Sequence, residues 1–210
     1  QAATIRFHYD QQFNAVSVVD ELGRNVETYT LDNQDRVQQV VNVENQTMSV
    51  LWGVADYVRS VTRFDGTTVT NEYNGDGFVS KTRFLDQTNT FAWYRNGLLR
   101  TAANATGTVS LTYDGANRLT QASNAAPKAA VTYGYYPAGN VSNAASLAGT
   151  TYYSYDAGER LTGISNAAAG AFAFGYNEYN GLVDTMNCTN RIKVEYGYDA
   201  LLDRLTSLTW

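Results

Sequence analysis

The sequence is poor in the residues that most often build chemical sites. Its only cysteine, Cys188, can form neither an internal disulfide nor a cysteine-based metal site. The surrounding residues, N-C-T-N, predict a loop. Its only histidine, His8, lies far from Cys188 in the sequence, so a thiol nucleophile would lack a nearby base. These shortages predict a chain that is not an enzyme and that carries no cofactor or metal site.

Charge is also scarce. Asp, Glu, Lys and Arg make up 17% of the 210 residues, below the roughly 25% usual in soluble domains. The net charge is −5, and Lys and Arg form no cluster that could neutralise phosphates, which argues against nucleic-acid binding. No apolar run reaches the 18 or more residues of a membrane-spanning helix, so we expect no membrane span.

Tyrosine and glycine are abundant, with 16 and 17 copies, and they recur in a repeat of about 21 residues. Each copy reads aromatic, Asp or Asn, two spacers, a turn residue, any residue, and Leu or Val; the best copies are Tyr113–Leu119, Tyr135–Val141 and Tyr155–Leu161. A period of this length indicates an array of one supersecondary unit. We call the first residue of each copy its anchor, and the anchors are Tyr9, Leu31, Trp52, Tyr73, Trp93, Tyr113, Tyr135, Tyr155, Tyr176 and Tyr198.

The repeat has a direct physical interpretation as two strands and a turn. A second bulky apolar residue often stands two places before the anchor, as Tyr153 does before Tyr155, and this spacing places both on one face of a strand. Asp after the anchor and Gly or Asn three places later fit a type I turn. The copy of Tyr155 has its glycine one place early, at Gly158, and the first and last copies, Tyr9–Val16 and Tyr198–Leu205, are one residue longer. The sequence predicts an all-β meander of about twenty antiparallel strands, each unit having one tight turn and one looser loop. Residues 45–63 could also form a helix, but the repeat favours strands there.

The strand number constrains the form of the sheet. Open twisted sheets rarely exceed about ten strands without curling or splitting, so a meander of this length should curl into part of a spiral or shell. One face should carry Tyr, Phe and Leu, the other Thr, Asn, Ser and Gln. The 44% of hydrophobic residues predict a core. We expect residues 1–210 to form one array of about ten repeats of 20–22 residues within a much larger protein.

The repeat resembles the YD repeat of the Rhs superfamily, with Tyr113–Leu119, Tyr155–Leu161 and Tyr198–Leu205 as the best matches. The superfamily includes polymorphic toxins, B and C components of insecticidal toxin complexes, wall-associated proteins and teneurins. The resemblance implies a spiral β-shell (a β-cocoon) that encloses and helps deliver a C-terminal effector domain. It also implies secretion or display on a bacterial surface, with further repeats of the same chain as partners. No segment resembles the core region and cleavage site that follow the repeats in complete members.

An alternative function is an extracellular module for carbohydrate binding, protein binding or adhesion. Its aromatic platforms would be Trp52, Trp93 and Trp210, although the repeat also explains the first two as packed anchors. The acidic residues that recur at one position of the repeat could bind a cation, but Asp at the start of a turn usually caps that turn. These residues are Asp10, Asp32, Asp114, Asp156 and Asp199.

Overall fold

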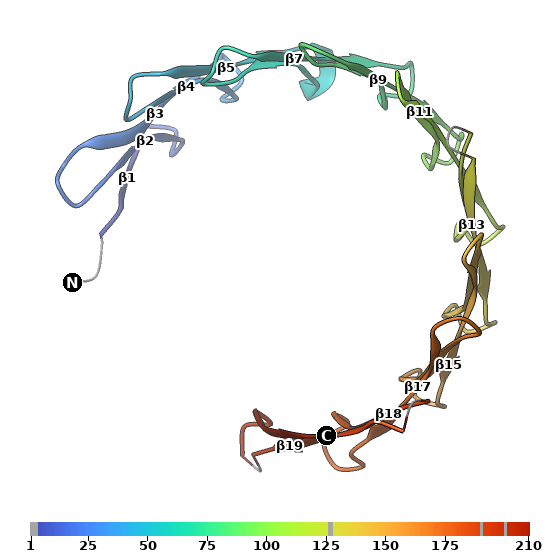
Figure 1. Cartoon of the computed structure of the whole chain (residues 1–210). Helices are drawn as coiled ribbons and strands as arrows, with labels where there is room; N and C mark the ends of the chain where they lie inside the picture. The colour runs from blue at the N-terminus through green and yellow to red at the C-terminus, as the bar shows by residue number, and fades with distance from the viewer. Residues whose placement is uncertain (1–3, 126–127, 190, 200) are drawn as a thin grey trace. The chain divides into compact units, whose positions relative to one another are not determined.

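The computed structural model describes residues 4–125, 128–189, 191–199 and 201–210. The chain divides into two compact units, Gln1–Thr106 and Gly107–Trp210, and each is a single layer of antiparallel strands (Figure 1). The prediction of an all-β hairpin meander is therefore confirmed. No helix among the described residues is long and apolar enough to cross a bilayer.

The first unit contains ten strands, each hydrogen-bonded to the next along the chain. Residues 45–63 form two of these strands, as the repeat predicted, with a short 3₁₀ turn, η1 (Val54–Asp56), between them. The strands are β1 (Arg6–Tyr9), β2 (Ala15–Val19), β3 (Asn25–Leu31), β4 (Val37–Asn42), β5 (Thr47–Trp52), β6 (Val58–Thr62), β7 (Thr68–Tyr73), β8 (Val79–Arg83), β9 (Thr88–Trp93) and β10 (Leu99–Asn104).

The second unit repeats this arrangement with ten further strands, again paired in chain order. Every odd-numbered strand of the chain ends on an anchor, and we call it an anchor strand; the even-numbered strand after it is the return strand. The strands are β11 (Gly107–Tyr113), β12 (Leu119–Asn124), β13 (Ala129–Tyr135), β14 (Val141–Ser146), β15 (Gly149–Tyr155), β16 (Leu161–Asn166), β17 (Gly170–Tyr176), β18 (Val183–Cys188), β19 (Lys193–Tyr198) and β20 (Leu205–Thr209).

Each anchor closes its hairpin across a β-bulge. In β15, Ser154 pairs with Gly163 and Tyr155 pairs with Leu161, which leaves Thr162 as the extra residue of the return strand. Bulges of this kind bend a strand and increase its local twist. Since the same irregularity precedes the anchor in hairpin after hairpin, the bend recurs with the period of the sequence repeat.

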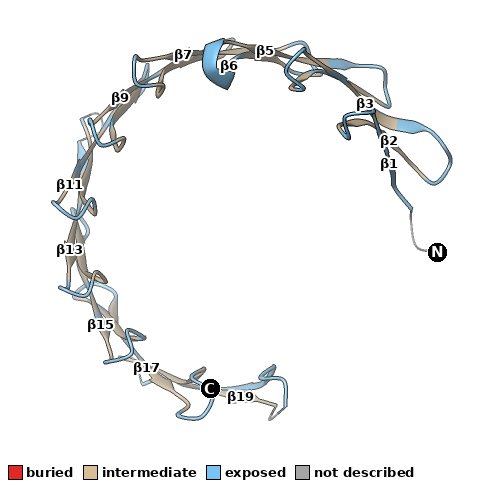
Figure 2. Cartoon of the chain, turned by 180° about the vertical axis from the view of Figure 1, so that it is seen from behind, coloured by how far each residue is buried: buried red, intermediate tan, exposed pale blue. Residues whose placement is uncertain are grey.

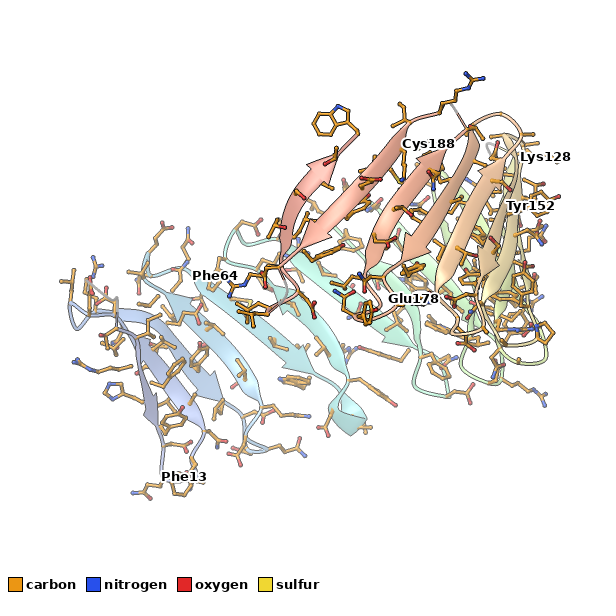
Figure 3. The ribbon with its side chains drawn as sticks, turned by 90° about the horizontal axis from the view of Figure 1, so that it is seen from below. Phe13, Phe64, Lys128, Tyr152, Glu178 and Cys188 are labelled. Atoms are coloured by element: carbon orange, nitrogen blue, oxygen red, sulfur yellow. The ribbon has the colours of Figure 1, made fainter. Side chains whose placement is uncertain are left out.

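The core that the composition predicted is not present among the described residues. Val40, at 5% exposure, is the single buried hydrophobic residue there, and the ribbon is otherwise half-buried or exposed (Figure 2). The prediction was wrong because it counted apolar residues without asking what would cover them. A single layer has no second sheet or helix on either face. Side chains therefore stand free on both sides of the strands (Figure 3).

Candidate functional site

The turn after each anchor is closed by the side chain that the sequence placed there. In the copy that begins at Tyr155, Asp156 Oδ1 accepts hydrogen bonds from the backbone N–H of Gly158 and of Arg160, each at 2.9 Å. The other recurring acids make equivalent bonds within their own turns. Capping therefore explains their recurrence, and among the described residues no group of three or more acidic, His or Cys residues could hold a metal ion.

Arginine reinforces three of these caps. Arg118 donates to Asp114 through Nε at 2.7 Å, and Arg36 and Arg160 make the same contact with Asp32 and Asp156. The Arg118 guanidinium and backbone N–H hold the pKa of the Asp114 carboxyl below its ordinary value. The Arg160 backbone N–H, followed by its guanidinium, lowers the pKa of Asp156 in the same way. In these two copies the repeat itself thus favours the ionised form of the turn acid.

The turn geometry differs from the sequence prediction in three copies. Glu159, with φ of 62°, takes the left-handed position that Gly158 was expected to supply, so the copy of Tyr155 keeps the regular register. In the copy of Tyr176 this position falls on Gly181, with φ of 71°, because the hairpin holds one extra residue. The first copy was predicted to be one residue longer, but Tyr9 pairs with Ala15 in the standard register.

The opposite ends of the hairpins are as tight as the anchor turns in several places. Asp20 caps a turn with a 2.9 Å bond from Arg24 N–H, and Asn42 does the same for Gln46. Ser146 pairs directly with Gly149, which leaves a two-residue loop. The prediction of a looser loop at these ends was therefore wrong there, since the same side-chain capping closes both ends.

At five junctions between repeats, the fifth residue after an anchor covers the ring of the next anchor, and we call it the covering residue. Arg160 lies over the Tyr176 ring with its Cζ 4.6 Å from the ring centroid, a cation–π contact. Aromatic covering residues stack instead, as Phe78 does on Trp93 at 5.1 Å. The covering pairs are Arg36 on Trp52, Tyr57 on Tyr73, Phe78 on Trp93, Arg118 on Tyr135 and Arg160 on Tyr176.

The polar tip of the covered ring completes the connection between repeats. The Tyr176 hydroxyl donates to the Leu161 carbonyl at 2.7 Å, where the preceding return strand begins. We call the covered ring and this hydrogen bond together a lock. The bond recurs from Trp52 to Val37, Tyr73 to Val58, Trp93 to Val79, Tyr135 to Leu119 and Tyr198 to Val183, at 2.7–2.9 Å. Each lock ties an anchor to the repeat before it.

One repeat reaches a similar contact with different residues. The copy of Tyr135 has Tyr136 in place of the turn acid and Asn140 in place of the covering arginine. The Tyr136 ring meets the Tyr155 ring edge-on, with centroids 6.1 Å apart, and its hydroxyl donates to the Tyr153 carbonyl at 3.0 Å. Contact with the following anchor is therefore kept although the Asp–Arg pair is absent.

A family comparison agrees with this geometry. Residues 93–128, which include the Trp93 and Tyr113 anchors and the turn between Tyr113 and Leu119, match the RHS Repeat family model. Residues 93–128 are thus similar to an RHS repeat. The resemblance to the Rhs/YD-repeat superfamily that the sequence predicted is thereby confirmed. A search of curated proteins gave no significant relative.

Solved structures share the fold of almost the whole chain. TcdB2-TccC3 matches 97% of this chain with a TM-score of 0.82 and 12% identity, and TcdB2-TccC3-Cdc42 does so with 0.81 and 12%. The Photorhabdus luminescens Tc holotoxin pore matches 97% of the chain with a TM-score of 0.67 and 10% identity. The chain spans only 12–15% of the length of these solved chains.

The histidine and the cysteine belong to different units, His8 to the first and Cys188 to the second. His8 is an exposed residue of β1, paired with Ser17. Cys188, which the sequence predicted to be in a loop, is the last residue of β18, and its N–H and carbonyl bond to Ile192 and Arg191. Cys188 is half-buried, and its backbone pairs across the strands with Phe172.

The tryptophans proposed as carbohydrate platforms have different environments. Trp52 and Trp93 are covered on one side by Arg36 and Phe78 and donate their indole N–H to the repeat before them, so both act as packed anchors. Trp210 is 88% exposed. Of the three tryptophans expected as platforms, Trp52 and Trp93 therefore already use one ring face and the indole N–H in contacts between repeats.

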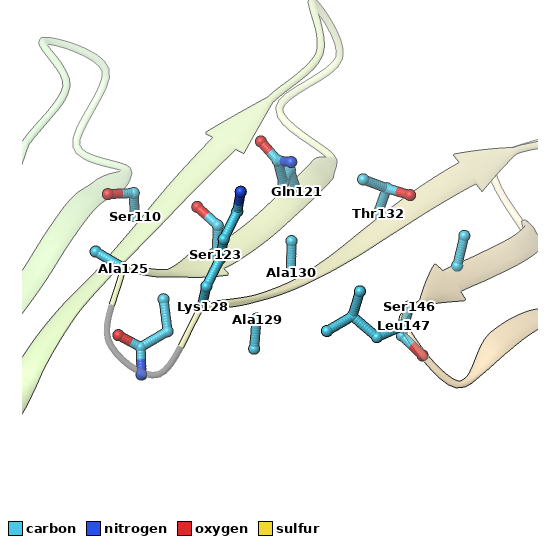
Figure 4. A pocket seen from close by; sticks show the side chains of 12 residues that line it. Ser110, Gln121, Ser123, Ala125, Lys128, Ala129, Ala130, Thr132, Ser146 and Leu147 are labelled. Atoms are coloured by element: carbon cyan, nitrogen blue, oxygen red, sulfur yellow. The ribbon is translucent and has the colours of Figure 1, made fainter.

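The second unit has an open depression of about 790 Å³ over β12 to β14 (Figure 4). Its lining includes the small side chains of Ser123, Ala130 and Ala145 and the longer ones of Lys128 and Leu147. Register places the three small residues on the face opposite the anchors, since Ser123 pairs with Ala130 while Ala122 pairs with Leu111. Among the described residues that line the depression, Lys128 is the one with a charge, so they include no acid–base pair.

Proposed function

We propose that this chain is a wall segment of a hollow β-shell that encloses a toxin or effector domain and helps to deliver it. The wall has no catalytic role of its own in this proposal. The observation that carries it is the single layer of locked RHS repeats, which has no core of its own among the described residues and matches Tc toxin structures in fold. A single layer with both faces uncovered suits the wall of a shell, because one face can line the interior while the other faces the outside.

The locks supply the stiffness that such a wall needs. Each lock joins residues about 15 positions apart and therefore connects one repeat to the next. Successive locks use different residues, so each connection is made separately. We therefore propose that residues 1–210 act as one array whose structural anchors are Tyr9, Trp52, Tyr73, Trp93, Tyr113, Tyr135, Tyr155, Tyr176 and Tyr198.

The partners of this wall would be neighbouring RHS repeats of the same, longer chain and an effector domain inside the shell. The small share of the solved chains that this chain spans supports a larger parent protein. Secretion from a bacterium or display on its surface is the setting that the proposal requires, because an enclosed effector has to reach a target cell.

Limited proteolysis of the whole parent protein tests the proposal. We expect the region after the repeats to resist protease in the intact protein and to be digested when it is expressed alone. Replacing the lock residues, Tyr135→Ala together with Tyr176→Ala, should open the wall and remove the protection. Tyr179→Ala is the matched control, since Tyr179 is 99% exposed. Equal digestion of the enclosed and the isolated region, or a reading frame without further repeats, would contradict the proposal.

A further inference from the structure

Asn74 stands at the first position of its turn, where other repeats have a capping acid. Its side-chain Oδ1 accepts hydrogen bonds from the backbone N–H of Asp76 at 3.0 Å and of Phe78 at 2.9 Å. The Asp114 carboxylate accepts the equivalent two bonds within its own turn, at 2.9 and 3.0 Å. Asn74 therefore caps with an amide the kind of turn that Asp114 caps with an acid.

A glycine follows the capping residue in both turns, as Gly75 and as Gly115. A Cβ added at either glycine would meet nothing within 4 Å, so neither position is crowded. Because glycine has no side chain, its backbone nitrogen can come close to the Cγ of the residue before it. An ionised carboxylate repels such an approach, whereas the neutral amide of Asn74 does not.

The two bonds of the cap point at the oxygen on which charge would develop. Attack by the Gly75 nitrogen on the Asn74 Cγ turns Oδ1 into an oxyanion. Preorganised N–H donors about 2.7–3.1 Å from such an oxygen stabilise the transition state. The donors of Asp76 and Phe78 lie within this range. The cap that closes the turn therefore also favours attack on its own amide.

The hydrogen bonding of the glycine nitrogen separates Asn74 from similar sites. Two further Asn–Gly pairs occur in the sequence, at Asn96–Gly97 and Asn180–Gly181. The Gly97 N–H donates to the Tyr94 carbonyl at 3.0 Å, and the Gly181 N–H donates to the Asn177 carbonyl at 2.9 Å. Within the described part of the chain, the Gly75 N–H donates to no acceptor. Its nitrogen can therefore reach the neighbouring amide without breaking a turn hydrogen bond.

We propose that Asn74 is a site of intramolecular deamidation promoted by its own capped turn. The Gly75 nitrogen loses its proton and bonds to Cγ, the bond from Cγ to Nδ2 breaks, and Nδ2 leaves with that proton as ammonia. One water molecule then opens the five-membered succinimide to give either aspartate or isoaspartate. This modification goes beyond the role as a wall segment and does not depend on what the wall encloses.

The two products would affect the turn differently. Aspartate at this position would cap the turn as Asp114 does. In isoaspartate the main chain runs through the former side chain, so the two N–H groups of the turn lose their acceptor. Because Phe78 ends this turn and covers the Trp93 ring, loss of the cap would weaken one contact between repeats.

Mass spectrometry of the aged protein tests the proposal. The whole parent protein is incubated in its folded state and digested, and the three Asn–Gly peptides are followed by the mass change from amide to acid. A turn hydrogen bond contributes about 0.5–1.5 kcal/mol. We therefore expect Asn74 to convert about tenfold faster than Asn96 or Asn180, a difference of about 1.4 kcal/mol in activation free energy.

Unfolding provides the reference for this comparison, because guanidinium removes the turns and leaves the three dipeptides alike. We expect the three sites to convert at similar rates there. Equal rates in the folded protein, faster conversion at Asn96 or Asn180, no conversion at Asn74, or the same ranking in guanidinium would overturn the proposal.

Gly75→Ala changes the attacking residue while leaving the cap in place. The added Cβ has room but shields the nitrogen, so conversion at Asn74 should slow about tenfold, equal to about 1.4 kcal/mol in activation free energy. Gly115→Ala is the matched control and should leave the rate at Asn74 unchanged. Asn74→Asp supplies the standard that distinguishes aspartate from isoaspartate in the peptides, and far-UV circular dichroism checks that the variants keep their strands. An unchanged rate in Gly75→Ala would also overturn the proposal.

Discussion

Replacing Tyr176 with phenylalanine would remove one hydrogen bond between consecutive repeats while leaving the ring in place. The hydroxyl lies 2.7 Å from the Leu161 carbonyl in a half-buried site, and the Arg160 guanidinium lies over the same ring. A typical intramolecular hydrogen bond contributes about 0.5–1.5 kcal/mol net. Since the ring contact survives the change, we expect Tyr176→Phe to lower the free energy of unfolding by about 1 kcal/mol.

Urea denaturation followed by far-UV circular dichroism measures this loss, and hydrogen exchange locates it. The exchange of backbone amides should accelerate first in β16 and β17, which the lock connects, because loss of a local tie lowers the free energy of local opening. Tyr179→Phe makes the same chemical change at a ring that is 99% exposed and should alter stability little. If the two variants lose the same stability to within about 0.3 kcal/mol, the lock has no energetic role and the reasoning fails.

Three further predictions concern the turns. Because Arg160 holds the pKa of Asp156 below its ordinary value, the ionised carboxyl stabilises the fold above about pH 4, and this effect is lost as the pH falls through the folded pKa. In urea titrations, the free energy of unfolding should therefore fall less between pH 5 and pH 2.5 for Asp156→Asn than for the original chain. Gly97→Ala should lower the free energy of unfolding by about 1 kcal/mol or more, since Gly97 has φ of 83° and an added Cβ would lie 3.1 Å from the Phe78 ring. Gly115→Ala is the control and should be near neutral, because there is open space around Gly115; equal losses of stability in the two variants would argue against this account. Arg160→Ala should lower the free energy of unfolding by about 0.5–1 kcal/mol through loss of the exposed cation–π contact, in addition to the effect of losing its pair with the turn acid. An unchanged urea midpoint would show that the contact does not stabilise the fold.

The turn chemistry was the part of the site most readily predicted from sequence. The roles of Asp114, at the start of its turn, and of Asn117, three places later, depend only on neighbouring residues. The Asp114 carboxylate accepts hydrogen bonds from backbone N–H groups within four residues of it. Gly158 was misassigned for a related reason. The left-handed position is set by hydrogen bonding across the turn, and Glu159 adopts it although a glycine stands beside it.

The locks were missed at the sequence level although their signal was present. The covering residue is Arg in some copies and Tyr or Phe in others, so its column in the repeat shows no single chemical type. Arg, Tyr and Phe side chains can all pack over an aromatic ring. This shared property would have identified the position five places after the anchor as a contact position.

By itself, the sequence determined the strand class, the period and the turn chemistry of this chain, because spacing by two, capping by Asp and left-handed turn positions act over a few residues. The tertiary structure alone decided which side chain covers which anchor, where the hairpins carry an extra residue, and that Val40 is the single buried hydrophobic residue among those described. These properties depend on contacts between residues about 15 apart across paired strands and on the absence of a second layer, neither of which a local pattern specifies.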